Sequence, residues 1–189
     1  MKKLSKITES IWSDIQDRSS GDTVREEDMI TSNEELRKKI RELYKEQGEG
    51  ETLDVSSLTN IIKCDDFSDI FQGFYKVKHI IGLEDWDVSN VEHMEGMFAE
   101  CEKFNADLSK WNVSGVGNMR CMFYNCKTFN SDLSKWNVSS VKDMGFMFWG
   151  CEKFNSDLSN WNVSSVEDVS IMFYDCKSLK QIPSWYINR

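Results

Sequence analysis

Apolar side chains recur at fixed positions through the second half of the chain. Each unit opens on a Trp, and these stand 25 residues apart at Trp86, Trp111, Trp136 and Trp161. Val, Met, Met and Phe then follow at positions i, i+3, i+6 and i+7, except that Val169 replaces the first Met in the last unit. This spacing predicts one face of a short helix or of 3₁₀ turns. A sequence that repeats at this length is typical of proteins built from stacked units, because no single unit can bury its own apolar residues.

A second apolar pattern within each unit predicts a short extended segment. The sequence Phe-Asn-x-Asp-Leu-Ser places Phe and Leu four residues apart, so both side chains point to the same side of a strand. We therefore expect short parallel strands around residues 107–108, 132–133 and 157–158. The leucines of these strands should lie in one column: Leu108, Leu133 and Leu158. One strand and one helical turn per unit is within the range of leucine-rich repeats, so the predicted fold class is an α/β solenoid of that kind with a helical N-terminal cap.

Residues 1–47 differ from the rest and are predicted to form two amphipathic helices. An apolar stripe in the first helix runs from Leu4 to Ile15. Ser32 or Asn33 can cap the second helix, because their side chains accept hydrogen bonds from free N–H groups at a helix start. The stripe of the second helix consists of Leu36, Ile40, Leu43 and Tyr44. This segment either covers the exposed end of the stack as a cap or docks on a partner.

The remaining chain divides into two parts. Residues 48–85 are predicted to form a degenerate first repeat, because the stretch that begins at Leu53 resembles the one that begins at Trp86. Residues 86–189 hold the regular repeats and a C-terminal cap. The tail resembles a final strand, in which Trp185 replaces the next periodic Trp one residue early.

A cysteine recurs at the same period, at Cys101, Cys126, Cys151 and Cys176. Equivalent residues on adjacent rungs of a solenoid lie about 4.8 Å apart, within the Cα separation that a disulfide requires. A Cys that recurs beside Met and Phe is more simply explained as a small buried hydrophobe. We therefore expect reduced, buried thiols and keep the disulfide ladder as the alternative.

Asn and Asp also recur in the units and predict two polar ladders. The asparagines are Asn105, Asn130 and Asn155. We expect their side chains to bond backbone groups at the turns between rungs, as Asn side chains do readily. The aspartates are Asp107, Asp132 and Asp157. Stacked carboxylates repel one another, and we expect hydrogen bonds or solvent to offset this, rather than calcium, which takes about six to eight oxygen ligands.

Composition and charge narrow the classes of function. The 189-residue chain has a formal net charge of -9, which disfavours nonspecific binding to nucleic acid or insertion at anionic membranes. No stretch reaches the roughly 18 consecutive apolar residues that span a bilayer. Glu9 and Asp14 interrupt the segment after the basic start, so we expect no secretory signal. These features favour a cytoplasmic or virion-associated protein over a Sec-secreted one.

Catalytic chemistry is poorly represented in the sequence. His79 and His93 have no counterparts in the other repeats. The chain has no phosphate-binding loop, nucleophile elbow or paired Cys-x-x-Cys zinc site. We therefore expect a protein that is not an enzyme, with no cofactor and no bound metal.

The position after the fixed Phe is the best binding candidate in the repeats. It changes residue type but keeps an aromatic side chain at Tyr124, Trp149 and Tyr174. This variation predicts a partly exposed aromatic column that anchors an interface, and the alternative is that these rings cover the edge of the core. The other candidates stand just before a Trp of the repeat: Lys110, Lys135 and Asn160. The Trp ladder itself is expected in the core rather than on a ligand-binding platform.

The repeat resembles a known family. Met-Phe-x-x-Cys-x-x-Phe-Asn-x-Asp-Leu-Ser-x-Trp-Asn-Val-Ser is similar to the 25-residue repeat of BspA-like leucine-rich-repeat surface proteins, strongly over residues 86–179 and loosely over residues 51–189. The resemblance implies a solenoid with a parallel sheet and a protein-binding or adhesive role toward a protein or glycan ligand. The start of the chain faintly resembles small proteins of gut bacteria and their phages. That likeness implies an alternative, a structural component of a particle such as a phage virion, docked through residues 1–47.

Overall fold

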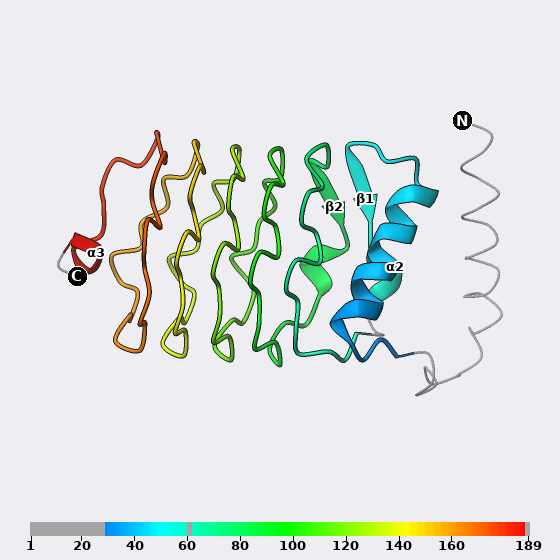
Figure 1. Cartoon of the computed structure of the whole chain (residues 1–189), viewed down its shortest axis with the longest axis horizontal. Coiled ribbons are helices and arrows are strands. Elements are labelled where there is room, and N and C mark those ends of the chain that lie inside the picture. The colour runs from blue at the N-terminus through cyan, green and yellow to red at the C-terminus, as the bar shows by residue number, and fades with distance from the viewer. Residues whose placement is uncertain (1–28, 60–61, 188–189) are drawn as a thin grey trace.

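The structure is a computed structural model that describes residues 29–59 and 62–187. Successive stretches of the chain lie side by side as a row of coils along the longest axis, with a helix at each end of the row (Figure 1). The described elements are helices α2 (Asn33–Glu46) and α3 (Ser184–Ile187), strands β1 (Thr52–Asp54) and β2 (His79–Ile81), and 3₁₀ helices at Ser56–Leu58 and Leu83–Asp85. The first predicted helix, from Leu4 to Ile15, lies outside the described residues.

Parallel backbone pairing joins each coil to the next. β1 pairs with β2, and Leu53 lies opposite Ile80. Farther along the row, isolated parallel bridges connect Asp66 with His93, His93 with Asn118, Asn118 with Asp143, and Asp143 with Asp168. The bridged residues are 27 positions apart at the first of these junctions and 25 apart at the others. The sequence period therefore corresponds to one coil of the row.

The backbone ladder does not run where the sequence predicted strands. Residues 107–108, 132–133 and 157–158 are irregular, and that prediction is wrong. The ladder runs instead through the segment that contains the Met-Phe step, for which we predicted helical or 3₁₀ turns. One coil donates to carbonyl oxygens of the next coil at 2.7–2.9 Å through the N–H groups of Met94, Gly96, Phe98 and Glu100.

The residues between these donors bond within their own coil. The N–H groups of Met97 and Ala99 donate to the carbonyl oxygens of Met94 and Gly96, three residues back. Alternate residues therefore bond the next coil and their own coil, which is the pattern of neither a strand nor a helix. This alternation needs left-handed backbone at two positions per coil, such as Cys121 with φ of 55° and Asn125 with φ of 57°.

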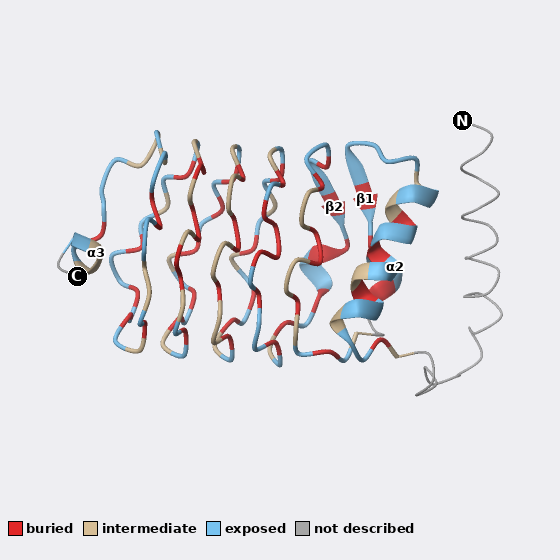
Figure 2. Ribbon diagram, viewed as in Figure 1, coloured by how far each residue is buried: buried red, intermediate tan, exposed pale blue. Residues whose placement is uncertain are grey.

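Stacked aromatic rings fill the centre of the row. Phe98, Phe123, Phe148 and Phe173 stack with ring centroids 5.6–5.8 Å apart and planes within 2–5° of parallel. The periodic tryptophans and leucines are buried beside them, and buried positions recur in every coil (Figure 2). The Trp ladder therefore lies in the core, as the sequence predicted.

Polar atoms inside the core also join adjacent coils. Trp136 Nε1 donates to Leu108 O, and Trp161 Nε1 donates to Leu133 O, each at 3.0 Å. The leucine column and the Trp ladder are thus linked by hydrogen bonds as well as by packing. Trp86 and Trp111 are equally buried, but their Nε1 atoms have no partner among the described residues.

The periodic cysteines are free thiols that bond to the preceding coil. Cys126 Sγ donates to Phe98 O and Cys151 Sγ donates to Phe123 O, each at 3.0 Å. Cys101 and Cys176 make the equivalent contacts, with Phe71 O and Phe148 O. Each thiol is therefore a hydrogen-bond donor between coils, buried in Cys101, Cys126 and Cys151 and partly buried in Cys176. The interpretation of these residues as small buried hydrophobes did not include this role.

Helix α2 covers the first coil of the row. The Ser32 side chain accepts a hydrogen bond from Glu35 N and caps the helix, and Leu36, Ile40 and Leu43 are buried, as the sequence predicted. Asn33 Nδ2 donates to Asp66 O at 3.1 Å and to Ser68 O at 2.9 Å. In later coils the equivalent carbonyl groups accept hydrogen bonds from backbone N–H groups of the preceding coil. At the first coil, the side-chain amide of Asn33 supplies these hydrogen bonds instead.

Two predicted details at the ends of the row are wrong. Leu53 does not take the Trp position of the first repeat, because in the register of β1 and β2 it lies opposite Ile80, six residues before Trp86. The tail forms helix α3 and no strand in the described residues. Trp185 still continues the Trp ladder, because its ring stacks on Trp161.

Candidate functional site: a lateral aromatic column

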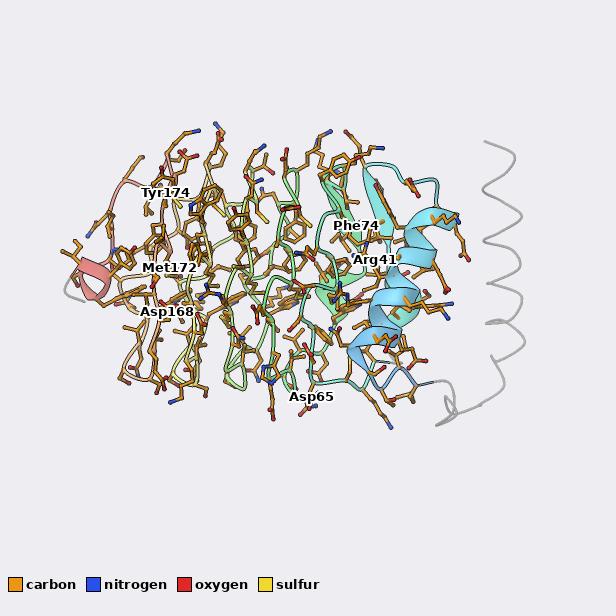
Figure 3. All side chains as sticks on the ribbon, viewed as in Figure 1. Arg41, Asp65, Phe74, Asp168, Met172 and Tyr174 are labelled. Carbon is orange, nitrogen blue, oxygen red and sulfur yellow. The ribbon has the colours of Figure 1, made fainter. Side chains whose placement is uncertain are left out.

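Three aromatic side chains on consecutive coils form a feature that we call the lateral aromatic column (Tyr124, Trp149 and Tyr174). The rings of Tyr124 and Trp149 stack with centroids 4.7 Å apart and 9° between their planes. The rings of Trp149 and Tyr174 stack at 5.7 Å and 12°. Tyr124 and Trp149 are half-buried, whereas Tyr174 is 61% exposed near the last coil (Figure 3). The column is therefore an ordered surface with its rings partly open to solvent.

Backbone bonds next to the rings hold the column at this spacing. Asn125 N donates to Trp149 O at 2.7 Å, and Gly150 N donates to Tyr174 O at 2.8 Å. Gly150 has φ of +73°, and a Cβ there would lie 3.3 Å from Asn125 Cα. The turn after each ring is thus fixed against its neighbour, which places the rings face to face before any ligand binds.

The column ends beside an acidic depression in the preceding coil. Ala99, which is buried, stands where the later coils carry an aromatic ring. The depression has a volume of about 350 Å³, and its lining includes Tyr124 together with Asp69, Glu95 and Glu100. Carboxylates beside an aromatic ring favour a cationic group at this end of the column.

The side chain of Arg120 reaches residues on the next two coils, and this contact was not predicted from the sequence. Its Nη1 atom lies 3.0 Å from Asp168 Oδ2 and 3.6 Å from Asp143 Oδ2. Its guanidinium carbon also lies 4.9 Å from the centre of the Phe146 ring. Hydrogen bonds from Ser170, and then from Arg120, lower the pKa of Asp168. The available signal was a lone Arg two residues after Asn118, whose next two periodic positions are Asp143 and Asp168.

The structure separates the other candidate residues from the column. Lys110 and Lys135 are exposed and line a shallow depression of about 660 Å³. Its lining includes Asp107 and Asp132 and none of the aromatic column residues. Asn160 is exposed at the equivalent position of the next coil. Lys110 and Lys135 therefore share a depression that none of the three column rings lines.

The asparagine ladder bonds backbone groups between coils. Asn105 Oδ1 accepts from Asn130 N at 2.8 Å, and Asn130 Oδ1 accepts from Asn155 N at 2.8 Å. Asn155 Oδ1 continues the series by accepting from Lys180 N at 2.9 Å. This confirms the predicted structural role, and it occupies the side-chain oxygens that a ligand would otherwise use.

The aspartate ladder is held by local hydrogen bonds. Asp107 Oδ1 accepts from Ser109 N at 2.9 Å, and Asp132 and Asp157 make the same bond to the Ser two residues later. The hydroxyl and the backbone N–H of Ser109 lower the pKa of Asp107, because both stabilise the carboxylate. These bonds and the exposure of the carboxylates offset the repulsion between coils.

Chemically reactive side chains are few in the described part of the chain. Burial raises the pKa of Cys101 to about 12 and the pKa of Cys64 to about 11, so these thiols stay protonated and are poor nucleophiles near neutral pH. His79 and His93 are both exposed. Among residues 29–59 and 62–187, no three His, Cys, Asp or Glu side chains are grouped to hold a metal ion.

None of the described helices has the length and apolarity that crossing a bilayer requires.

The repeat pattern matches one protein family over most of the chain. The family described as "Mycoplasma protein of unknown function, DUF285" matches residues 65–186. The chain belongs to the DUF285 family. BspA-like repeat proteins are in this group. The DUF285 region contains the periodic tryptophans and the whole lateral aromatic column. Comparison with curated proteins and with solved structures gives no match.

Proposed function

We propose that this DUF285 protein is a non-enzymatic protein-binding module, in which the row of coils is a leucine-rich-repeat-like solenoid of the BspA-like type. The lateral aromatic column carries the proposal, because its stacked rings are ordered and yet partly open to solvent. Adhesion is the form of binding that the resemblance to BspA-like proteins favours. The absence of a reactive nucleophile among the described groups fits binding better than catalysis.

The physical advantage of such a column is preorganisation. Tyr and Trp side chains offer a large contact area and have only two rotatable bonds, so ordering them costs little entropy. Here stacking and the backbone bonds of Asn125 and Gly150 restrict the rings before a ligand arrives. Buried aromatic anchors of this sort supply much of the binding energy in protein interfaces.

Charge favours a protein partner with basic side chains. The acidic depression beside Tyr124 suits a Lys or Arg that approaches the ring, and cation–π contacts of this kind contribute about 0.5–2 kcal/mol. The chain as a whole carries a net charge of -9, which attracts basic surfaces over distances of about 10 Å at ordinary salt. A neutral glycan would gain from the rings but not from the carboxylates.

Site-directed photo-crosslinking tests the proposal in the native source. We would place p-benzoylphenylalanine at Tyr174 or, as the matched control, at Tyr75, which is 58% exposed and outside the column. The expected result is a protein captured at Tyr174 and not at Tyr75. Adding Trp149→Ala should lower that capture at least tenfold, while circular dichroism and the melting temperature show that the chain remains folded.

Two results would contradict this function. One is identical capture at Tyr174 and Tyr75, which would mean nonspecific contact with the surface. The other is capture that survives Trp149→Ala undiminished, which would mean that the partner contacts another face. A glycan array probed with the unmodified protein checks the competing ligand class, and strong binding there, lost in Tyr174→Ala, would replace protein by carbohydrate.

A further inference from the structure

Hydrogen bonds between coils run in one direction through the Met-Phe segment. In each coil alternate N–H groups donate toward α3, and the carbonyl groups of the residues between them accept from the side of α2. The same four-bond pattern joins Phe67–Gly73 to the next coil, and it recurs down to the bonds from Met144, Phe146, Phe148 and Gly150. The segment therefore has one edge of donors and one edge of acceptors.

The two ends of the row are consequently different. At the first coil, the acceptors Asp66 O and Ser68 O are occupied by Asn33 of α2. At the last coil, four N–H groups occupy the donor positions and have no acceptor among the described residues. We call this the open donor edge, and its donors are the N–H groups of Val169, Ile171, Phe173 and Asp175.

We propose that the open donor edge binds an extended segment of a partner protein, which lies against it as a further layer and accepts its hydrogen bonds through backbone carbonyl oxygens. Every equivalent edge in the interior of the row is covered in this way by the carbonyl groups of the next coil. Strand addition to an edge is an established way in which proteins recognise peptides.

A second copy of this chain does not fit the edge. Two open donor edges facing each other would place N–H groups against N–H groups, with no acceptors between them. Head-to-tail pairing would need the carbonyl edge of the first coil, and Asn33 already bonds two of its groups. Direct pairing between the ladder edges of two copies is therefore disfavoured at both ends, and the occupant that we propose is a segment of a different polypeptide.

The side chains around the edge define the chemistry of the segment. Ile171 is 48% exposed and Tyr174 is 61% exposed, although the residues at the same position in the preceding coils are less exposed. An aromatic side chain of the partner would stack on Tyr174, as Tyr174 itself stacks on Trp149. An apolar side chain beside it would cover Ile171.

Charge and shape at the Val169 end add a second requirement. A depression of about 390 Å³ opens there between Tyr186 of α3 and the residues Val169 and Ser170. Glu167 and Asp168 line the same depression. Asp168 is paired with Arg120, whereas the Glu167 side chain is 78% exposed and only 4.0 Å from Lys142 at its nearest. The bound segment should therefore carry a basic residue that faces Glu167, next to its apolar and aromatic positions.

Removing one donor atom tests the proposal directly. Native chemical ligation at the Gly150–Cys151 junction joins residues 1–150 to a synthetic peptide of residues 151–189. An amide-to-ester change at Ile171 then replaces one edge N–H by oxygen and leaves every side chain in place. The matched control is the same change at Asn160, whose N–H also has no described acceptor and lies outside the edge.

The probe is a displayed library of random twelve-residue peptides, selected on the all-amide protein. We expect enriched peptides with an aromatic, an apolar and a basic position, and we expect the Ile171 ester to weaken their binding about tenfold, the effect of losing roughly one hydrogen bond. The Asn160 ester should bind within about twofold of the all-amide protein. Amide protection from hydrogen exchange at Ile171 and Asp175 should rise in the complex.

Specific results overturn the proposal. It fails if no peptide is enriched, or if the enriched peptides bind the Ile171 ester and the all-amide protein equally. It also fails if binding is lost in Trp149→Ala but not in the Ile171 ester, because those peptides would then occupy the lateral aromatic column. That last result would support the proposed function while removing this inference, so the two fail separately.

Discussion

At the scale of single residues, side chains in this protein act mainly between coils. The Cys126 thiol bonds the coil before it, and the Trp136 indole does the same. Arg120 reaches Asp168, 48 positions later, across the surface of the intervening coil. Gly145 allows that path, because a Cβ there would lie 2.7 Å from Arg120 Nη1 and 2.8 Å from Asp168 Oδ2.

Gly145→Ala should therefore destabilise the fold. We expect the free energy of unfolding in urea to fall by up to about 1 kcal/mol, since the added methyl group forces this partly exposed ion pair apart. Gly117→Ala is the matched control, because its Cβ would meet nothing closer than Glu92 O at 3.8 Å. That variant should be as stable as the wild type or slightly more stable, because alanine restricts the unfolded chain. Equal losses in both variants would show that the Arg120 path does not depend on Gly145.

The buried thiols make stability depend on pH above the neutral range. Burial raises the pKa of Cys101 to about 12, so the unfolded chain loses this proton at lower pH than the folded protein does. The contribution is complete below a pH of about 8.5 and is lost as the pH rises toward 12. Between pH 9 and 11 the free energy of unfolding should fall more steeply in the wild type than in Cys101→Ala, by up to about 1.4 kcal/mol per pH unit. Parallel pH profiles would contradict this.

At the scale of elements, helix α2 supplies at the first coil what a neighbouring coil supplies elsewhere. Its apolar stripe covers the end of the core, and Asn33 satisfies two carbonyl groups of the backbone ladder. The salt bridge between Arg37 and Asp69, with 3.8 Å between charged atoms, lies in the same contact but is partly exposed. The amide of Asn33 is therefore the more specific part of the cap.

Asn33→Ala should expose the first coil without unfolding the row. We expect a loss of about 1–3 kcal/mol, because two bonds disappear and two carbonyl groups are left unsatisfied. Hydrogen exchange should accelerate in residues 66–73 and remain unchanged in residues 119–150. Lys38→Ala, at an exposed position of the same helix, serves as the control and should change neither quantity. Faster exchange throughout the row would show instead that α2 supports every coil.

The sequence predicted those elements whose side chains recur, and it missed those set by the backbone. The Trp and Phe ladders, helix α2 and the role of Asn105 followed from periodic apolar positions, a capping residue and ordinary Asn chemistry. The alternating ladder was missed because its left-handed positions are occupied by residues such as Cys121 and Phe146, where glycine is the usual signal. The aromatic column could be placed from its spacing, whereas the separation of Lys110 and Lys135 from it required the path of the coil.

At the scale of the whole molecule, stability arises at the junctions between adjacent coils. Rings, thiols, indoles and backbone groups all bond the neighbouring coil, as expected for a chain of nearest-neighbour interactions. An interior coil has two such junctions. The coils at either end have one junction and a helix, and the first of these helices is long whereas α3 spans only Ser184–Ile187.

Trp136→Ala should consequently destabilise the protein more than Trp86→Ala. Both indoles are buried, but only Trp136 has its Nε1 bonded to the preceding coil in the described structure. We expect losses of about 4 kcal/mol and about 3 kcal/mol, from the cavity in each case and the broken bond in one. Chemical denaturation measures both, and Trp136→Phe separates the bond from the ring. A larger loss in Trp86→Ala would mean that the N-terminal junction is the stronger one.

The backbone and thiol contacts between coils repeat at a fixed spacing. Gene segments that each encode one interior coil are therefore interchangeable. Excision of residues 119–143 would bring Phe98 beside Met147 in place of Met122, and the Cys151 thiol would reach Phe98 O in place of Phe123 O. The backbone-ladder and thiol contacts are replaced by ones of the same type, whereas the ion pairs of Arg120 and the stack of Tyr124 on Trp149 are lost. Unequal recombination between repeats can therefore shorten or lengthen such a gene while the backbone ladder continues across the joint. Array length, and with it the number of aromatic positions presented to solvent, is thereby free to vary during evolution while the architecture stays the same.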